Sequence, residues 1–350
     1  MIDWLGKPYY SLDAYMKHHF GQKVYKIAVD AGLNCPNRDG TLGYGGCIFC
    51  SEGGSGDFAV SIQEDAMRFE HRCGQVYHKE YAGRQSMSRR ILDVSRQIER
   101  GMAKFQKKVG EKFVIYFQAF TNTYGDREYL EAIWQAALEH PDVVGISIAT
   151  RPDCLGIAET GCYEQTKGIL EVLRRLQGMA RERGQFVWVE LGLQTIHEQT
   201  VRRIRRGYDN EVYEKAADAL SDIGIEVITH VILGLPDEST EDMLETVRYV
   251  CNPKHKVSGI KLQLLHVLKG TDLCKEYEAG EVRVMEYEEY LNLIAACLKE
   301  IPKDIVIHRL TGDGPKSILV APMWSANKRR VLNGLHKTFK EQGIIQGKNT

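Results

Sequence analysis

Short apolar runs of strand length alternate with longer segments of helical period, and this alternation constrains the fold more than any other feature. Each run is nearly continuous in apolar or β-branched residues, as expected for strands that are buried on both faces. The predicted strands are Val24–Val29, Phe113–Phe120, Val143–Ala149, Phe186–Leu193, Glu226–Leu233 and Gly259–Val267, with helices at about 86–109, 126–139, 164–182, 209–223 and 240–251. Such alternation is typical of βαβ units and predicts an α/β fold with a parallel sheet.

The carboxy-terminal part of the chain follows a looser pattern. Beyond Val267 the sequence predicts a helix near 286–300, a strand at Ile305–Leu310 and a basic helix from about 325 to 341. We interpret this part as a small α/β extension. The predicted division is an amino-terminal segment 1–20, a core barrel 21–268 and the extension 269–350. Six strands in series fit an open or a closed barrel, and the pattern alone leaves both possibilities.

Charge, targeting signals and cysteine content indicate the partners and the compartment that the chain is suited to. Its 46 basic and 47 acidic residues give a net charge of -1, which argues neither for nor against a polyanionic partner. The amino terminus has no apolar core of a signal peptide, and no run approaches the roughly 18 apolar residues of a membrane span. Nine cysteines without an export signal predict the cytoplasm, where neighbouring cysteines bind metal more often than they form disulfides.

Three cysteines follow the first predicted strand. Cys47 and Cys50 form a C-x-x-C pair, and the glycine-rich stretch Gly43–Gly46 lets the chain fold back so that Cys35 joins them. Three thiolates would leave one iron of a [4Fe–4S] cluster open to a substrate or cofactor. Barrels of this kind keep their chemistry at the carboxyl ends of the strands, where this loop lies.

Two other interpretations of this motif remain open at the level of the residues. A zinc site would need a fourth ligand, which Cys73 or His71 could supply. The cysteines could also be unreactive packing residues, although a polar, glycine-rich loop is a poor place for a core. The remaining cysteines are scattered and are interpreted as packing residues: Cys73, Cys154, Cys162, Cys251, Cys274 and Cys297.

Several longer stretches of the sequence are recognisable. They are Asn34–Gly40, Cys47–Ser51, Tyr116–Tyr124, Ile148–Asp153, Glu190–Thr195, His230–Pro236 and His308–Asp313. With these stretches the chain resembles the radical S-adenosylmethionine (SAM) superfamily, specifically its YtqA/YhcC-type subfamily, which is related to the catalytic subunit of the Elongator complex. Eleven residues separate Cys35 from Cys47, where the commonest superfamily spacing is three, and the subfamily shares this longer loop. Nothing in the chain resembles the acetyltransferase domain of Elongator.

The resemblance implies a fold, two cofactors and a partner. The expected fold is a (βα)6 partial TIM barrel with the small carboxy-terminal extension. The expected cofactors are a [4Fe–4S] cluster on Cys35, Cys47 and Cys50, and SAM bound to its open iron. One electron from a reducing partner such as flavodoxin or ferredoxin would cleave SAM to methionine and a 5′-deoxyadenosyl radical.

Residues near the ends of the strands are the expected SAM contacts. Phe49 lies inside the C-x-x-C turn and is placed to cover the adenine, while the main chain around Val231 and Leu233 resembles the segment that holds it. Gln118, Thr121, Asn122, Thr150 and Arg151 end two strands and suit the amino-acid or ribose part of SAM. Glu190 and Gln194 share one face of the fourth strand because their spacing is even. His230, His266 and His308 lie on or near strand ends, and no role is assigned to them.

The resemblance also implies a substrate, the side chain of a tRNA wobble uridine. The expected reaction trims a 5-carboxymethylaminomethyl group to 5-aminomethyl. Two basic clusters are candidate RNA contacts: Arg202, Arg203, Arg205 and Arg206, and Lys328, Arg329 and Arg330. They are equally compatible with ordinary solvated helix surface. The alternative substrate classes are a small metabolite and a protein side chain, and a binding module without enzyme activity is a further alternative.

Overall fold

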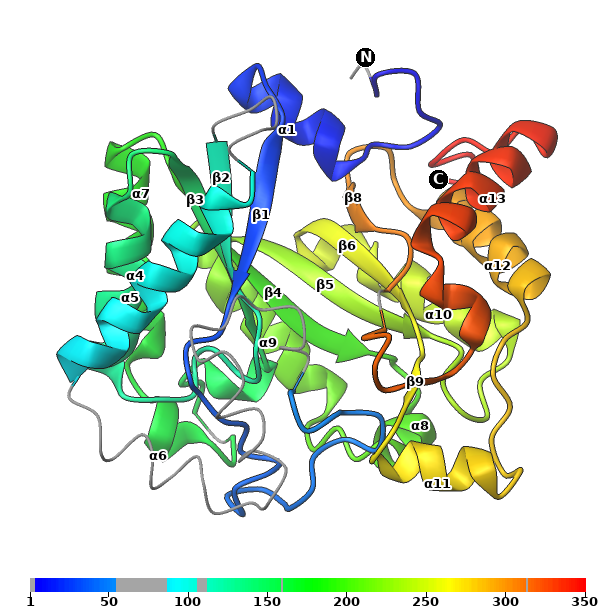
Figure 1. Cartoon of the computed structure of the whole chain (residues 1–350), viewed down its shortest axis with the longest axis horizontal. Coiled ribbons are helices and arrows are strands. Elements are labelled where there is room, and N and C mark those ends of the chain that lie inside the picture. The colour runs from blue at the N-terminus through cyan, green and yellow to red at the C-terminus, as the bar shows by residue number, and fades with distance from the viewer. Residues whose placement is uncertain (1–3, 55–86, 106–111, 159, 313) are drawn as a thin grey trace.

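Seven parallel strands form one curled sheet (Figure 1). The computed structural model describes residues 4–54, 87–105, 112–158, 160–312 and 314–350. In spatial order the strands are β1 (Val24–Val29), β2 (Lys112–Phe117), β3 (Val143–Thr150), β4 (Phe186–Gln194), β5 (Glu226–Leu233), β6 (Val257–Leu264) and β8 (Val306–Arg309). Every neighbouring pair is parallel. The predicted partial barrel is confirmed.

Helices return the chain from the end of one strand to the start of the next and cover the outer face of the sheet (Figure 1). The long helices are α4 (Met87–Ala103), α5 (Arg127–Glu139), α7 (Ile169–Glu182), α9 (Asn210–Asp222), α10 (Thr240–Val250), α12 (Tyr287–Glu300) and α13 (Lys328–Glu341). The short elements are α1 (Leu12–Phe20), α6 (Tyr163–Thr166), α8 (Glu198–Arg203), α11 (Asp272–Glu278), the antiparallel pair β7 (Val267–Leu268) and β9 (Leu319–Ala321), and the 3-10 turns η2 (Pro152–Cys154), η3 (Pro253–His255) and η4 (Met323–Ala326).

The main differences from the predicted elements occur where the backbone turns. β2 ends at Phe117 rather than at Phe120, which has a left-handed φ of 58°. The helix predicted at 164–182 is divided into α6 and α7, because Gly168 adopts a φ of 85°. The strand predicted to end at Val267 leaves the sheet after Leu264 and continues as β7.

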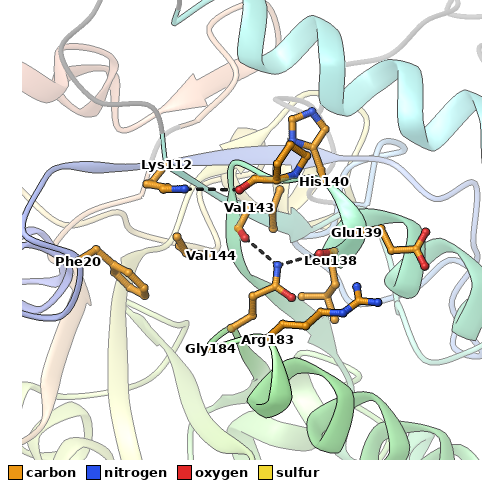
Figure 2. Close-up of a pocket in the computed structure, with 11 residues that line it drawn as sticks. Phe20, Lys112, Leu138, Glu139, His140, Val143, Val144, Arg183 and Gly184 are labelled. Carbon is orange, nitrogen blue, oxygen red and sulfur yellow. Dashed lines mark hydrogen bonds between the residues drawn. The ribbon is translucent and has the colours of Figure 1, made fainter.

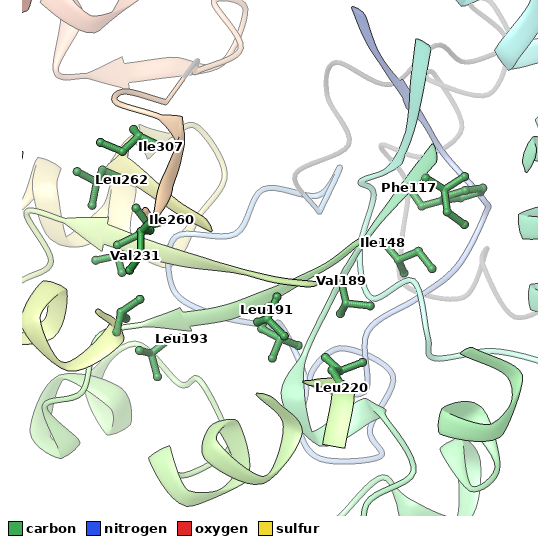
Figure 3. Packing of buried hydrophobic residues seen from close by; sticks show 14 of the residues in the cluster. Phe117, Ile148, Val189, Leu191, Leu193, Leu220, Val231, Ile260, Leu262 and Ile307 are labelled. Carbon is green, nitrogen blue, oxygen red and sulfur yellow. The ribbon is translucent and has the colours of Figure 1, made fainter. Parts of the chain in front are cut away.

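The outward-pointing side chains of the strands form the main core. They belong to one buried cluster, of which Figure 3 shows some members along the strands; Phe117, Ile148, Leu191 and Leu262 are among those with no exposed surface. Burial of a side chain of this size stabilises a fold by roughly 1.5–3 kcal/mol. Packing against the helices therefore stabilises the outer face of the curled sheet. The concave face is lined by the inward-pointing side chains, which do not belong to this core.

Helix α1 covers the end of the barrel where the strands begin. Its Met16 packs against Val114, Trp188 and Ile228, which point into the concave face near the strand starts. In Figure 1, α1 lies at the opposite end of the sheet from the loop that follows β1. The amino-terminal segment therefore covers much of this end of the barrel, beside a hollow of about 350 Å³ that Tyr15, Trp188 and His308 help to line.

Strand β8 comes from the predicted carboxy-terminal extension, yet it is part of the main sheet. It pairs with β6, and Ile307 on it forms a parallel bridge with Ser11. Gln346 joins the same region: its side chain is fully buried, accepts a hydrogen bond from Tyr10 N at 2.8 Å and donates to Pro302 O at 2.6 Å and Ile305 O at 2.8 Å. The two ends of the chain therefore brace the edge of the barrel together.

A hollow of about 560 Å³ lies where β2, β3 and β4 begin (Figure 2). Phe20, Lys112, His140 and Arg183 are among its lining residues, and Lys112 Nζ donates to Pro141 O at 3.4 Å. Because parallel strands all begin at this edge, the hollow is at the far end of the sheet from the cysteine loop. None of the described helices combines the length and the apolar character that a bilayer crossing requires.

We predict that Gln346→Ala lowers the free energy of unfolding by about 2–4 kcal/mol, because the buried Tyr10 N–H and the Ile305 carbonyl lose their side-chain partner, while Pro302 O keeps the bond from Ile305 N. Urea denaturation checks this value. Gln342→Ala is the matched control, since Gln342 bonds Asn292 at an exposed position and its loss should cost less than about 0.5 kcal/mol. Equal stabilities of the two variants would contradict the bracing role of Gln346.

Candidate active site

The loop after β1 carries Cys35, Cys47 and Cys50 to the carboxyl end of the barrel. All three residues are partly exposed. Cys50 N donates to Cys47 O at 3.0 Å, so the C-x-x-C segment forms a tight turn. Ile48, between them, packs into a small apolar cluster and donates its N–H to Ile204 O at 3.3 Å. This contact anchors the turn to the segment that follows β4.

A small hairpin explains the long interval between the first two cysteines. An antiparallel bridge joins Asp39 to Tyr44 within it. Where the hairpin closes, Gly46 N donates to Asn37 O at 2.8 Å. Gly46 has a φ of 76°, a left-handed conformation that favours glycine. Because the hairpin returns on itself, the second cysteine comes back beside the first.

Arg38 fixes the second half of the loop, although the sequence analysis gave it no role. Its Nη2 donates to Cys50 O at 2.9 Å and to Ser51 O at 2.5 Å. Its guanidinium lies 5.5 Å from the centroid of the Phe120 ring. Gly54 packs against the same ring so closely that a Cβ there would be 2.3 Å from Phe120 Cδ1. The ligand loop is thus shaped by contacts within the protein.

The surroundings of Cys47 favour a protonated thiol in the absence of metal. Burial, and next the nearby Cys50, raise the pKa of the Cys47 thiol to about 12 against the opposing effect of Arg151. Cys47 Sγ also accepts a hydrogen bond from Asn37 Nδ2 at 3.8 Å. A metal ligand must be a thiolate, so metal binding at this site releases protons.

The donor set fits a polynuclear cluster better than a single ion. In a zinc site with Zn–S bonds of about 2.3 Å, the sulfur atoms lie about 4 Å apart. Among the described residues, the groups whose ligand atoms all lie within 4.8 Å of one another are Asp153, Cys154 and Cys162, and His197, Asp242 and Glu245. The three loop cysteines are not such a group. The candidate fourth zinc ligands, Cys73 and His71, lie outside the described residues.

The other described cysteines are packing residues, as predicted. Cys154, Cys162, Cys251, Cys274 and Cys297 are all buried. The carboxylate beside the first two of them, Asp153, accepts hydrogen bonds from Arg151 Nε at 3.0 Å and Nη2 at 2.8 Å. This ion pair accounts for the charge on Asp153.

Three of the predicted SAM contacts have surface available at the mouth of the barrel. Phe49, Gln118 and Gln194 are each partly exposed. Gln194 adopts a φ of 64°, and its Oε1 accepts a hydrogen bond from Tyr208 at 3.2 Å. Its side-chain nitrogen lies over Gly192, where a Cβ would be 2.4 Å away. Gln194 therefore reaches over the concave face, where a ligand in the mouth would lie.

Four further predicted contacts near the strand ends have little exposed surface. Thr121, Asn122, Thr150 and Arg151 are all buried. Asn122 Nδ2 donates to Ala149 O at 3.0 Å, which links the end of β2 to β3. The Oδ1 atom of Asn122 is buried with no hydrogen-bond partner among the described residues. Their role toward SAM stays a prediction.

Val231 and Leu233 have side chains that are fully buried in the main core. Contact with adenine would come through their main chain, as the resemblance implies. Glu190 lies inside the barrel and is held by cations from other strands, and its role toward SAM stays a prediction.

Glu190 lies in a polar layer halfway along the barrel. Glu190 accepts hydrogen bonds from Lys26 Nζ at 2.9 Å, Ser147 Oγ at 2.5 Å and Lys261 Nζ, and it lies 2.6 Å from His230 Nε2. Burial alone would raise the pKa of Glu190, but the two lysines outweigh it and hold the pKa well below its usual range. The carboxylate is therefore ionised. The sequence signal for this layer is Lys261, a lysine in the middle of a largely apolar strand, and the sequence analysis assigned it no role.

The basic cluster after β4 does not form one surface. The structure corrects the prediction that Arg206 contacts RNA, because its side chain is only 1% exposed. All five of its donors are used, by the main-chain oxygens of Leu193, Thr195 and Tyr208 and by Asn210 Oδ1. Arg205 has a φ of 57°, and this turn sends the next residue inward.

The remaining arginines of that cluster have acidic partners. Arg202 pairs with Glu198 on the same helix, Arg205 with Asp272, and Arg203 donates to both carboxylate oxygens of Glu276 at 3.0 and 2.9 Å. In the second cluster, Lys328, Arg329 and Arg330 are all exposed in the first turn of α13. The role of both clusters in RNA binding stays a prediction.

Comparison with known proteins identifies the family. Residues 35–250 match the Radical SAM superfamily, and residues 257–341 match the Radical_SAM C-terminal domain. The protein YtqA of Bacillus subtilis is 40% identical over 342 residues, which cover 98% of this chain and 92% of that protein. The chain belongs to the radical SAM superfamily.

More distant relatives of this radical SAM enzyme are also similar over long stretches. The tRNA uridine(34) acetyltransferase of Methanocaldococcus jannaschii is 27% identical over 202 residues, which cover 57% of this chain and 34% of that protein. The solved structure of Methanocaldococcus infernus Elp3 with an N-terminal deletion has a TM-score of 0.60 at 18% identity, over 92% of this chain and 64% of that one. This structural likeness shows the fold alone.

Family membership decides between the interpretations of the cysteine loop. A radical SAM enzyme uses a [4Fe–4S] cluster and SAM, and it needs a one-electron reductant. The three partly exposed cysteines at one mouth, with one iron left for SAM, fit that requirement. Family membership therefore favours a cluster over zinc or simple packing, and Cys35, Cys47 and Cys50 stay its predicted ligands.

We predict that anaerobic reconstitution loads one [4Fe–4S] cluster, and that Cys35→Ala, Cys47→Ala or Cys50→Ala each abolish it, since three thiolates are the smallest set that holds the cube. Iron analysis and the visible absorption of the cluster measure this. Cys297→Ala, at a buried cysteine far along the chain, is the control and should load normally. Normal loading of any of the three ligand variants would remove that residue from the site.

We predict that stability falls as the pH decreases from about 6.5 to 4. Burial, and next the charge of Lys261, lower the pKa of His230 to about 4, whereas the unfolded chain titrates near 6.5. The unfolded state then binds a proton that the native state does not, so the loss reaches about 3 kcal/mol at pH 4. Urea midpoints at several pH values test this. A His230→Gln variant with the same pH slope as the parent would exclude His230 as the source.

Proposed function

We propose that this radical SAM enzyme modifies the side chain of a tRNA wobble uridine and converts a 5-carboxymethylaminomethyl group to 5-aminomethyl. The observation that carries the proposal is the similarity to a relative named for acting on uridine 34 of tRNA, over 57% of this chain. The match covers 34% of that relative's own length, so we infer a shared target base and not a shared acetyl transfer.

The shape of the site supports a base as substrate. The cysteine loop is at one mouth of the barrel, and α1 covers much of the other end. The reacting group must therefore enter deeply from the mouth. A wobble base is single-stranded and splays out of the anticodon loop readily, so it can reach such a site.

The first turn of α13 supports contact with phosphate. It carries Lys328, Arg329 and Arg330 and no acidic residue, although the positive end of a helix dipole disfavours cations. Phosphate groups would relieve this repulsion. Arg202 is paired with Glu198 at 2.8 Å, but 79% of its side chain is accessible, so phosphate can replace this solvated partner. Arg203 and Arg205 are largely neutralised by their acidic partners, and Arg206 is excluded by burial.

Each part of the chain has a task in this proposal. The cluster and SAM, when bound, supply a 5′-deoxyadenosyl radical that abstracts hydrogen from the substrate. Cys35, Cys47 and Cys50 hold the cluster, and Phe49, Gln118 and Gln194 line the mouth where SAM lies. Helix α1 covers much of the far end. A cytoplasmic flavodoxin or ferredoxin is the proposed electron donor.

We predict that deletion of the gene changes one 5-substituted wobble uridine in bulk tRNA, with the carboxymethylaminomethyl precursor accumulating and the aminomethyl product falling at least about tenfold. Mass spectrometry of nucleosides from the deletion and parent strains measures both. Complementation with the wild-type gene should restore the product, whereas Cys47→Ala should not. An unchanged set of modified uridines would favour a small metabolite or a protein side chain as the substrate.

A further inference from the structure

The polar layer around Glu190 is assembled from strands that are far apart in sequence. Lys26 comes from β1, Glu190 from β4 and Lys261 from β6. Contacts across the barrel between these strands require all of these side chains to point into the concave face. His230 on β5 joins them, with Nε2 2.6 Å from the Glu190 carboxylate.

This layer is covered on the side of the strand starts, here called below, and is accessible on the side of the cysteine mouth, here called above. Below it, toward the strand starts, α1 packs on the apolar side chains of Val114, Trp188 and Ile228. Above it, the inward-facing Ala149, Gly192 and Gln263 are partly exposed, although their outward-facing neighbours are fully buried. The side chains of Lys26 and His230 are 23% and 16% exposed. A group that enters from the cysteine mouth therefore meets the cations of this layer.

A hydrogen-bonded series extends the layer toward the mouth. Gln263 Nε2 lies 3.2 Å from His230 Nδ1, so His230 accepts there and donates from Nε2 to Glu190. Gln263 Oε1 in turn accepts from Arg309 Nη1 at 3.5 Å. This directed series holds the guanidinium of Arg309 at the upper rim of the layer.

The charges of the layer do not balance. Among the described residues that form it, Lys26 and Arg309 are cationic side chains, and Glu190 is the one anion; Tyr116, Ser147, His230 and Gln263 are neutral, and Lys261 is not counted because burial lowers its pKa well below the usual value. Excess positive charge away from bulk water is costly unless an anion neutralises it. Charge-assisted hydrogen bonds from ammonium and guanidinium groups are well suited to a carboxylate.

We propose that this layer binds the carboxylate of the substrate side chain, with Lys26 and Arg309 as its donors and Glu190 as the residue that positions them. The inference rests on the proposed function, because the 5-carboxymethylaminomethyl group is the side chain that carries a carboxylate. The aminomethyl product has a cationic amine at its end instead. The cations of the layer attract the substrate and repel the product, which favours product release.

Binding to the full-length protein with its cluster and SAM, without reductant, tests the assignment. The probes are anticodon stem–loop RNAs that carry 5-carboxymethylaminomethyluridine, 5-aminomethyluridine or unmodified uridine at the wobble position. We expect the first RNA to bind at least about tenfold tighter than the second, as one charge-assisted contact would give. Lys26→Met and Arg309→Met should each remove most of this preference. Lys112→Met, at the opposite end of the sheet, should keep it.

Two further measurements distinguish binding of the substrate carboxylate from binding of the SAM carboxylate. SAM has its own carboxylate, so its affinity is measured in the same variants. An unchanged SAM affinity supports the substrate assignment, whereas a tenfold loss with an unchanged RNA preference assigns the layer to SAM and overturns it. N-methylglycine, a small mimic of the side chain, should give a saturation-transfer signal with the parent protein and a weaker one with Lys26→Met.

The outcomes also separate this inference from the proposed function. Equal binding of all three RNAs by the parent protein overturns the inference and leaves the proposed function standing. Binding of none of the RNAs counts against the proposed function, and the N-methylglycine signal then decides the inference alone. Equal N-methylglycine signals from the parent protein and Lys26→Met would overturn the inference that the layer binds the substrate carboxylate.

Discussion

The common direction of the seven strands is the constraint on which the rest of the structure depends. A parallel strand cannot follow its neighbour through a tight turn, so a helix must carry the chain back on one side of the sheet. The helices therefore occupy the outer face, and the concave face is left to inward-pointing side chains. The same constraint gathers all strand ends at one mouth, and the loop with three cysteines, Gln118 and Gln194 all lie at this end of the strands.

The inside of the barrel changes character along its length. An apolar layer packs on α1, an ionic layer follows, and partly exposed residues line the mouth. Burying the Glu190 carboxylate is costly, and removal of one cationic partner from such a group typically costs about 3–5 kcal/mol. Well-packed apolar residues would stabilise a barrel at least as well. The ionic layer is therefore better explained by what it binds than by stability.

The sequence predicted the elements well because strands buried on both faces have an unmistakable apolar pattern. Element ends were less predictable, since residues such as Phe120 take left-handed conformations that no local pattern indicates. The cysteine loop was predictable because its ligands are close in sequence. The ionic layer was not, since Lys26 and Glu190 meet across 164 positions of the chain. Arg202 and Arg206 look alike in sequence, yet one is exposed and the other is fully bonded inside.

The hairpin between Cys35 and Cys47 has a consequence for how such proteins are detected. Its ends meet through a main-chain hydrogen bond between Asn37 and Gly46, so the positions of the cysteines are set by the neck of the hairpin and not by its length. Residues at its tip can be added or lost without moving the sulfur atoms. Sequence searches that require a fixed interval between the first and second cysteine will therefore overlook chains that build the same site with a hairpin of another size.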